Sequence, residues 1–283
     1  MSPSDPARKP GLVRFFGDLA RNHQLYVGLT AVALAYLVLR WYFLLTSDDL
    51  LLAADARTYW GAPYEDPYRG PQLGLPGAYL YSPAFLQALA PLRLLPWEVF
   101  HAMWAALGFG ALVLLVGPIG GALAVTALPF VYRDLLVGNI HLMLAASIVI
   151  GMRFSPMWAI PLLTKVTPGV GVLWFAGRRE WRRFAIAIAT TAAIALASYA
   201  IAPGLWFDWA ERLRGDTERA GDIYVALLGV RLALGAVLVA YAGRSGRAWL
   251  VPIGVVLALP ILWPDSLAIL LACFPLATGY RCR

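Results

Sequence analysis

Long, continuous apolar runs separated by short polar stretches dominate the pattern along this chain. The longest runs lie at about Leu25 to Leu45, 97–116, 184–202 and 223–242. They approach or reach the roughly 20 residues that a helix needs to cross the hydrocarbon core of a bilayer. Backbone groups in lipid must be satisfied internally, so spans are helices or a closed barrel. Because the runs are continuous rather than alternating, the pattern predicts an all-α, polytopic integral membrane protein.

Shorter apolar segments leave the number of crossings open. They lie at about 119–133, 138–152, 249–263 and 266–280, and a short helix is predicted from Pro83 to about Leu95. The stretch 154–177 either crosses once, with Arg153 facing outward, or is broken near Pro161 and Pro168 into a hairpin with Lys165 near its tip. Broken helices are tolerated where they line a cavity. We expect about eight to ten transmembrane helices in a single membrane domain, 1–283, without internal repeats.

The distribution of charged residues along the chain predicts its membrane topology. Only 14% of the residues are charged, and the net charge of +7 comes from basic residues that cluster at the ends of apolar runs rather than from a patch suited to nucleic acid. The strongest cluster comprises Arg178, Arg179, Arg182 and Arg183. The positive-inside rule then places the N-terminal segment 1–24 and the C-terminus in the cytoplasm. We predict a multi-pass protein of the cell (plasma) membrane, with extracytoplasmic loops at 46–82 and 203–222.

The first of these loops is the most unusual polar stretch. It holds five of the sixteen carboxylates, namely Asp48, Asp49, Asp55, Glu65 and Asp66, together with six aromatic residues. Helix capping accounts for Asp48 and Asp49, because they follow Thr46 and Ser47 at a helix boundary. As metal ligands they would be the alternative candidates. Such a composition is typical either of a loop whose polar groups carry out chemistry at the membrane surface or of an ordinary solvated loop.

Asp55 is the leading candidate for a catalytic group. It follows the apolar stretch LLLAA and lies four residues before Tyr59, so a short helix would place both on one face. Partial desolvation near lipid would tune its carboxylate toward a general base. A helix-end or surface charge is the alternative interpretation.

Lys165 is the clearest candidate outside the loop. It interrupts the apolar run AIPLLTKVTPGVGVLWF, and an ionisable residue within a membrane segment is a functional hypothesis by default. A lysine point charge suits a phosphate. Snorkelling of the side chain to an interface is the alternative.

The remaining predicted substrate-binding residues are more ambiguous. Asn139 and His141 begin an apolar segment, where they either hydrogen-bond a sugar or phosphate or merely cap a helix and face the headgroups. Arg231 lies near the middle of a predicted span and needs an anionic partner, either a lipid phosphate or a structural acid. Three loop residues complete the set: Arg57, Tyr59 and Tyr81. Aromatic rings stack on sugars, but they also form belts at every bilayer interface.

The second acidic loop carries its own helical pattern. Its segment LWFDWAERL places Trp206, Trp209 and Leu213 on one helical face. This predicts an amphipathic helix at the membrane interface. The chain contains no P-loop, dinucleotide fingerprint, zincin motif or serine-hydrolase signature that would suggest a nucleotide-driven mechanism.

Five short motifs in order resemble those of the membrane-embedded GT-C glycosyltransferases, and most of all glycosyltransferase family 87, the PimE-like polyprenol-phosphate-mannose-dependent mannosyltransferases. The matching elements are Asp55 with Tyr59, Gly61 to Asp66, Tyr79 to Pro83, Gly138 to His141, and Lys165 to Pro168 ahead of Arg179-Glu180-Trp181. Three elements depart from the family pattern. Gly61 to Asp66 matches Gly-x-Pro-x-Tyr-Asp only loosely. Ser82 replaces the first Pro of a Tyr-x-Tyr-Pro-Pro opening, and Gly-Asn-Ile-His replaces Gly-Gln-x-Asn.

The resemblance implies a GT-C-like bundle with short broken helices around a cavity. It implies an inverting transfer of a sugar, most often mannose, from a polyprenyl-phosphate-linked donor to a glycolipid or glycan acceptor at the outer leaflet. Asp55 would remove the acceptor proton, and Lys165, with His141 or Arg231, would stabilise the leaving phosphate. Because a phosphate leaving group needs no nucleotide-coordinating metal, neither a metal nor another cofactor is expected.

Two other classes of function stay open on the sequence alone. One is a transporter or flippase for a lipid-linked sugar, for which inverted repeats would be expected and none is visible. The other is a non-catalytic membrane subunit of a glycan-assembly complex.

Overall fold

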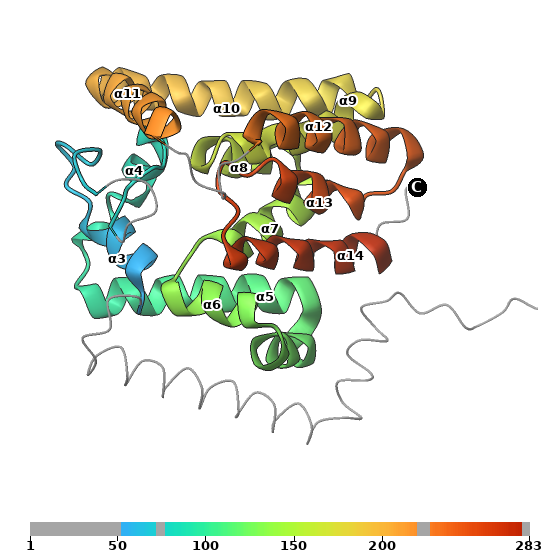
Figure 1. Cartoon of the computed structure of the whole chain (residues 1–283), viewed down its shortest axis with the longest axis horizontal. Coiled ribbons are helices and arrows are strands. Elements are labelled where there is room, and N and C mark those ends of the chain that lie inside the picture. The colour runs from blue at the N-terminus through green and yellow to red at the C-terminus, as the bar shows by residue number, and fades with distance from the viewer. Residues whose placement is uncertain (1–51, 72–76, 220–226, 279–283) are drawn as a thin grey trace, which may run out of the picture.

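A computed structural model describes residues 52–71, 77–219 and 227–278 as a bundle of helices, with no strand among these residues (Figure 1). The predicted N-terminal segment 1–24, the first span at Leu25 to Leu45, and Asp48 with Asp49 lie outside the described residues. So does part of the loop 203–222.

The helices are short in the middle of the chain and long on either side of it. The α-helices are α3 (Ala54–Gly61), α4 (Pro83–Leu89), α5 (Trp97–Ala127), α6 (Pro129–Val137), α7 (His141–Gly151), α8 (Ala159–Thr164), α9 (Leu173–Gly177), α10 (Trp181–Ile201), α11 (Pro203–Arg219), α12 (Leu228–Ser245), α13 (Leu250–Leu257) and α14 (Cys273–Thr278). The 3₁₀ helices are η1 (Leu92–Leu94), η2 (Ser155–Trp158), η3 (Thr167–Val172) and η4 (Pro264–Ala272).

The described residues include three helices long and apolar enough to cross a membrane: α5, α10 and α12. A fourth candidate is the pair α6 and α7, which is bent by 106°. The chain is therefore an all-α, polytopic membrane protein, as its hydropathy predicts. The total of eight to ten crossings stays a prediction, because the other apolar segments are divided into shorter helices.

The predicted segment at 119–133 does not form one continuous helix, and neither does the short helix predicted from Pro83 to about Leu95, which ends at Leu89 and is followed by η1. The predicted span does stop being regular near Val116, since Gly117 has φ 74° and ψ 170°. The chain then resumes as a helix to Ala127, and α6 begins at Pro129. Prolines account for both breaks, because Pro118 and Pro129 lack the N–H that would continue the preceding helix and are suited to a first turn.

The stretch 154–177 is not one straight helix. It consists of η2, α8, η3 and α9, and the break between α8 and η3 falls at Lys165 and Val166, where Val166 has φ 56°. Pro168 follows in the first turn of η3. The break at Lys165 agrees with the second alternative, whereas Pro161 lies inside α8; a hairpin across the break stays a prediction.

Close approach of helix backbones holds α12 against its neighbours. A Cβ on Gly243 would lie 2.5 Å from the carbonyl oxygen of Trp174, and one on Gly235 would lie 2.5 Å from that of Gly254. Small residues at such crossings are typical of helix packing in membranes. Lipid tails are as apolar as the side chains, so the helices associate through close packing of their backbones rather than through hydrophobic burial. This packing fixes α9 and α13 on either side of α12.

The predicted amphipathic helix of the second loop is α11, and it lies against the first loop. The Trp209 indole donates to the carbonyl of Leu80 at 3.1 Å. The Arg212 guanidinium donates to the carbonyls of Tyr68 at 3.1 Å and Gly70 at 3.2 Å. In Figure 1, α3, α4 and α11 accordingly lie at the same end of the bundle.

Gly138 fixes how closely α3 approaches the bend between α6 and α7. It has φ 70° and ends α6, and a Cβ at this position would lie 2.7 Å from the Cβ of Ala56. We expect Gly138→Ala to lower the free energy of unfolding by about 3 kcal/mol, through left-handed strain together with overpacking. Thermal unfolding in detergent measures this loss.

Gly246→Ala is the matched control for that experiment. Gly246 has φ 69°, but a Cβ there would meet nothing within 4 Å. Strain alone should then cost about 1 kcal/mol. Equal losses in the two variants would show that contact with Ala56 contributes nothing.

Candidate active site

The start of α3 is hydrogen-bonded to the end of α6. Ala53 takes a left-handed conformation and donates its N–H to the carbonyl of Leu136 at 2.9 Å. Ala56 and Tyr59 are buried on the face that packs toward α6 and α7. The catalytic candidate Asp55 lies next to this face, so its place depends on the end of α6.

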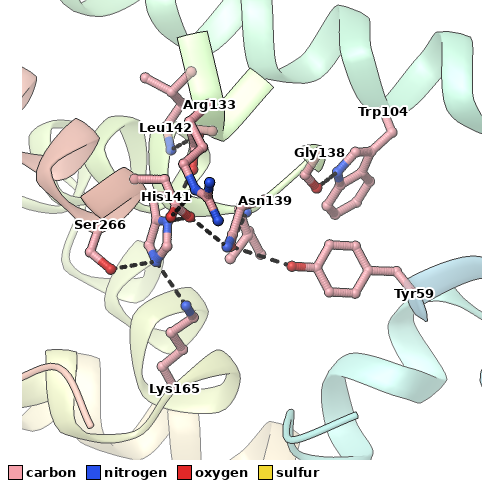
Figure 2. A network of polar contacts seen from close by, with 12 residues as sticks. Tyr59, Trp104, Arg133, Gly138, Asn139, His141, Leu142, Lys165 and Ser266 are labelled. Carbon is pink, nitrogen blue, oxygen red and sulfur yellow. Dashed lines mark hydrogen bonds and ion pairs between the residues drawn. The ribbon is translucent and has the colours of Figure 1, made fainter. Parts of the chain in front are cut away.

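A buried polar cluster lies beyond α3, made of Asp134, Asn139, His141, Lys165 and Asp265. Its members come from α6, the α6–α7 bend, the α8–η3 break and η4. His141 is at its centre and is fully buried. Its Nδ1 lies 2.9 Å from Asp134 Oδ1, and its Nε2 lies 2.8 Å from Lys165 Nζ (Figure 2).

Asn139 connects this cluster to the aromatic residues of the loop. Its Nδ2 donates to Asp265 Oδ2 at 3.0 Å, while its Oδ1 accepts the Ile140 N–H at 2.7 Å. The Tyr59 hydroxyl points at the same Oδ1 from 3.5 Å (Figure 2). Tyr59 and Tyr81 share a hydrogen bond of 2.7 Å between their hydroxyls. A continuous polar path thus joins Tyr81 to Asp265.

Asp55 is partly buried at the edge of this cluster, and α3 lies outside the spanning helices. The pKa of its carboxyl is raised to about 6, mainly by burial and to a smaller extent by the carboxylates of Asp265 and Asp134. Lys165 opposes the shift, since a nearby cation favours the ionised carboxylate. A carboxylate with this pKa is mostly ionised at neutral pH and close to the ideal for a general base.

A cavity of about 700 Å³ lies on the other face of α3. Four residues of the helix, at 3.6-residue spacing, line it: Ala54, Arg57, Thr58 and Gly61. Tyr79 also lines this cavity, and its buried hydroxyl has no hydrogen-bond partner within the described part of the chain. Asp55 therefore lies between the cavity and the cluster, because its neighbours in the helix line the first and its electrostatic partners form the second.

The predicted site residues divide into two groups. The structure brings Asp55, Tyr59, Tyr81, Asn139, His141 and Lys165 together, although these residues are far apart in the sequence. Arg57 instead faces the cavity, with its guanidinium 4.9 Å from the Trp97 ring centroid.

Arg231 makes contacts of a different kind. Its guanidinium donates to the carbonyls of Leu257 at 3.2 Å, Leu259 at 2.9 Å and Pro260 at 3.3 Å. These carbonyls lie at the end of α13 and in the connection that leads to Asp265. This geometry favours a role in holding that connection over contact with a donor phosphate.

Sequence reasoning missed the two buried acids, Asp134 and Asp265, which are 1% and 3% exposed. A signal was present for both. Each interrupts a largely apolar stretch, VYRDLLVG and ILWPDSLAIL, and an acid at membrane depth is a functional hypothesis just as Lys165 is. Nothing in the sequence joins two acids that lie so far apart.

Asp134, His141 and Asp265 also form a set that could hold a metal ion, since their ligand atoms all lie within 4.8 Å of one another. Two cations face the same carboxylates. Arg133 Nε lies 3.4 Å from Asp265 Oδ1, and Lys165 lies on the far side of the His141 ring. The carboxylates are thus already balanced by protein charges, and this arrangement favours a hydrogen-bonded cluster over metal ligation.

The contacts of Arg231 lead to a test of its role. We expect Arg231→Gln to lower the free energy of unfolding by about 2 kcal/mol, because the carbonyl oxygens at the end of α13 lose charged donors. The Michaelis constant for a sugar donor should not change. Arg244→Gln, at an exposed site on the same helix, is the control. A higher Michaelis constant with unchanged thermal stability would support donor binding by Arg231 instead.

Comparison with known proteins gives one match. The family model described as glycosyltransferase family 87 matches residues 79–276, which contain the whole buried polar cluster and Tyr81 but not α3. Neither the curated proteins nor the solved structures give a match. Because the family match covers well over half of the chain, the protein belongs to glycosyltransferase family 87.

Proposed function

We propose that this glycosyltransferase moves a sugar, with inversion, from a polyprenyl-phosphate donor to a glycolipid or glycan acceptor at the extracytoplasmic side of the membrane. Mannose is the sugar favoured by the resemblance to PimE-like enzymes. One observation carries the proposal: Asp55, a carboxylate with a raised pKa, lies between an open cavity and a buried cationic group. A direct displacement requires a base beside the acceptor and a positive charge beside the leaving group.

Asp55 would act as the base. Its carboxylate takes the proton of an acceptor hydroxyl while the hydroxyl oxygen attacks the anomeric carbon. The bond from that carbon to the phosphate oxygen breaks, and polyprenyl phosphate leaves with the electron pair. Attack on the face opposite the leaving group inverts the anomeric centre.

Lys165 would stabilise the charge that develops on the phosphate. The Nζ atom lies at the break between α8 and η3, 2.8 Å from His141 Nε2 and 5.8 Å from the ring centroid of Tyr81. Lys165 is half-buried, and a fixed cation that is partly shielded from water stabilises a developing anion more than the same cation in solvent does. Asn139 and Tyr81 supply further polar groups on the same side.

The acceptor would occupy the cavity on the other face of α3. Arg57 gives this cavity a positive charge, and the unpartnered Tyr79 hydroxyl supplies a group able to hydrogen-bond a sugar. The cavity wall is otherwise mostly Ala, Gly and Pro, which leave room for a pyranose ring.

The arrangement of α10 supports an extracytoplasmic site. The arginine cluster stands at its start, while Gln87 of α4 bonds the Ser198 carbonyl near its other end at 3.2 Å. At 1.5 Å per residue its 21 residues span about 31 Å, the thickness of the hydrocarbon core. If the arginines face the cytoplasm, the end that carries α4 and α11 faces outward.

Replacing the proposed base tests the proposal directly. Asp55→Asn keeps the shape of the side chain and removes its basicity, so transfer from a polyprenyl-phosphate sugar should fall by about 10²- to 10⁴-fold. A radiolabelled donor with lipid acceptors in proteoliposomes measures it. Glu65→Gln, an exposed site in the same loop, should transfer at the wild-type rate. Full activity of Asp55→Asn would exclude this residue as the base.

The raised pKa of Asp55 predicts the acid limb of the pH profile. A base works only when deprotonated, so kcat/KM should be constant above pH 7 and fall tenfold per unit well below a pKa of about 6. Lys165→Met removes the largest influence that lowers this pKa and should move the limb to higher pH. An acid limb of the kcat/KM profile with its midpoint near pH 4 would instead indicate a solvated carboxylate.

A further inference from the structure

The two nitrogens of the His141 ring have different partners. Nδ1 faces carboxylate oxygens, at 2.9 Å to Asp134 Oδ1 and 3.4 Å to Asp265 Oδ2. Nε2 faces Lys165 Nζ at 2.8 Å and Ser266 Oγ at 3.4 Å (Figure 2). The ring is fully buried, so water cannot replace any of these partners.

These partners determine which nitrogen carries the hydrogen. An ionised carboxylate only accepts hydrogen bonds, so Nδ1 must donate. An ammonium group only donates, so Nε2 must present its lone pair to Lys165. Asp134 cannot easily turn away, because its second oxygen accepts the Leu142 N–H at 3.2 Å.

A neutral ring in contact with Lys165 has an electrostatic consequence. A carboxylate at the same 2.8 Å would form an ion pair and neutralise the lysine. A neutral imidazole orients the ammonium without cancelling its charge, and the Tyr81 ring, 5.8 Å from Nζ, does the same from another side. No carboxylate of the described residues makes an ion pair with Lys165, although Asp55, Asp265 and Asp134 attract it over longer distances.

We propose, building on the proposed function, that Asp134 is a positioning residue. Through His141 in its Nδ1–H tautomer, Asp134 holds Lys165 as a cation with no carboxylate in direct contact, at the place where the donor phosphate binds. Asp265 favours the same tautomer, because its Oδ2 also faces Nδ1, at 3.4 Å. Asp134 itself touches neither donor nor acceptor.

The tautomer is directly measurable. The chain has three histidines, so ¹⁵N-histidine labelling gives few NMR signals, and His141→Gln assigns the one in the cluster. We expect the wild-type His141 signal to be that of the Nδ1–H form, the minority form of free histidine in water. Asp134→Asn should shift it toward the Nε2–H form. A wild-type Nε2–H ring would overturn the proposal.

A double-mutant cycle separates positioning from a general structural role. Asp134→Asn and Lys165→Met should each lower kcat/KM for the donor by roughly ten- to a hundredfold, and together by no more than Lys165→Met alone, because one acts through the other. Asp208→Asn, exposed on α11, should leave kcat/KM unchanged. Losses that multiply in the double variant would mean that Asp134 acts independently of Lys165, against the proposal.

Two further outcomes distinguish this inference from the proposed function and from metal binding. If the wild type transfers no sugar, the proposed function fails, and the NMR measurement still decides the tautomer. If transfer occurs with an Nε2–H ring, only the inference fails. A His141 signal that changes when EDTA is added would make Nδ1 a metal ligand and would also overturn the inference.

Discussion

The rest of the structure depends on balancing charge where water is excluded. Two carboxylates, Asp134 and Asp265, are almost completely buried, and an unpaired buried charge costs several kcal/mol. Arg133 and Lys165 supply the opposite charges, and His141 lies between them with a partner on each ring nitrogen. Removing any one group leaves another buried and unsatisfied, so the helices that carry them must meet at this point.

This requirement explains where the helices break. A straight helix directs its side chains outward from one axis and uses its backbone groups in its own hydrogen bonds. It therefore cannot bring side chains and unpaired backbone groups together at the cluster. The bend at Gly138 places Asp134 of α6 beside His141 of α7, and the break at Val166 frees Lys165 to face His141. Irregular backbone at membrane depth is tolerated when it is enclosed by protein, and the α6–α7 bend is enclosed in this way, since Gly138 packs on Ala56 of α3 and Asn139 is buried.

Much of this arrangement follows from the sequence, because it depends on local patterns. Continuous apolar runs predict the fold class, the Asp55–Tyr59 spacing predicts their common helix, and the charge of Lys165 within an apolar run marks a break. Contacts between distant residues do not follow in the same way. Asn139 and Asp265 are 126 positions apart and meet through one 3.0 Å hydrogen bond, and no periodicity in either segment identifies the other. The break at Leu128 inside the predicted segment 119–133 was missed for another reason, since Pro129 interrupts a stretch that is apolar on both sides.

The position of α3 places the proposed acceptor site and the proposed phosphate site on different sides of Asp55. One face of this eight-residue helix packs on the bend of α6 and α7, and another lines the open cavity. The Asp55 carboxylate lies between these faces, so a single group can be near an acceptor from one side and a cationic cluster from the other. Each member of the cluster has partners on separate elements, whereas the cavity is built largely from loop residues with small or exposed side chains. Substitutions in the loop can therefore change which acceptor fits without disturbing the charge balance on which Lys165 depends.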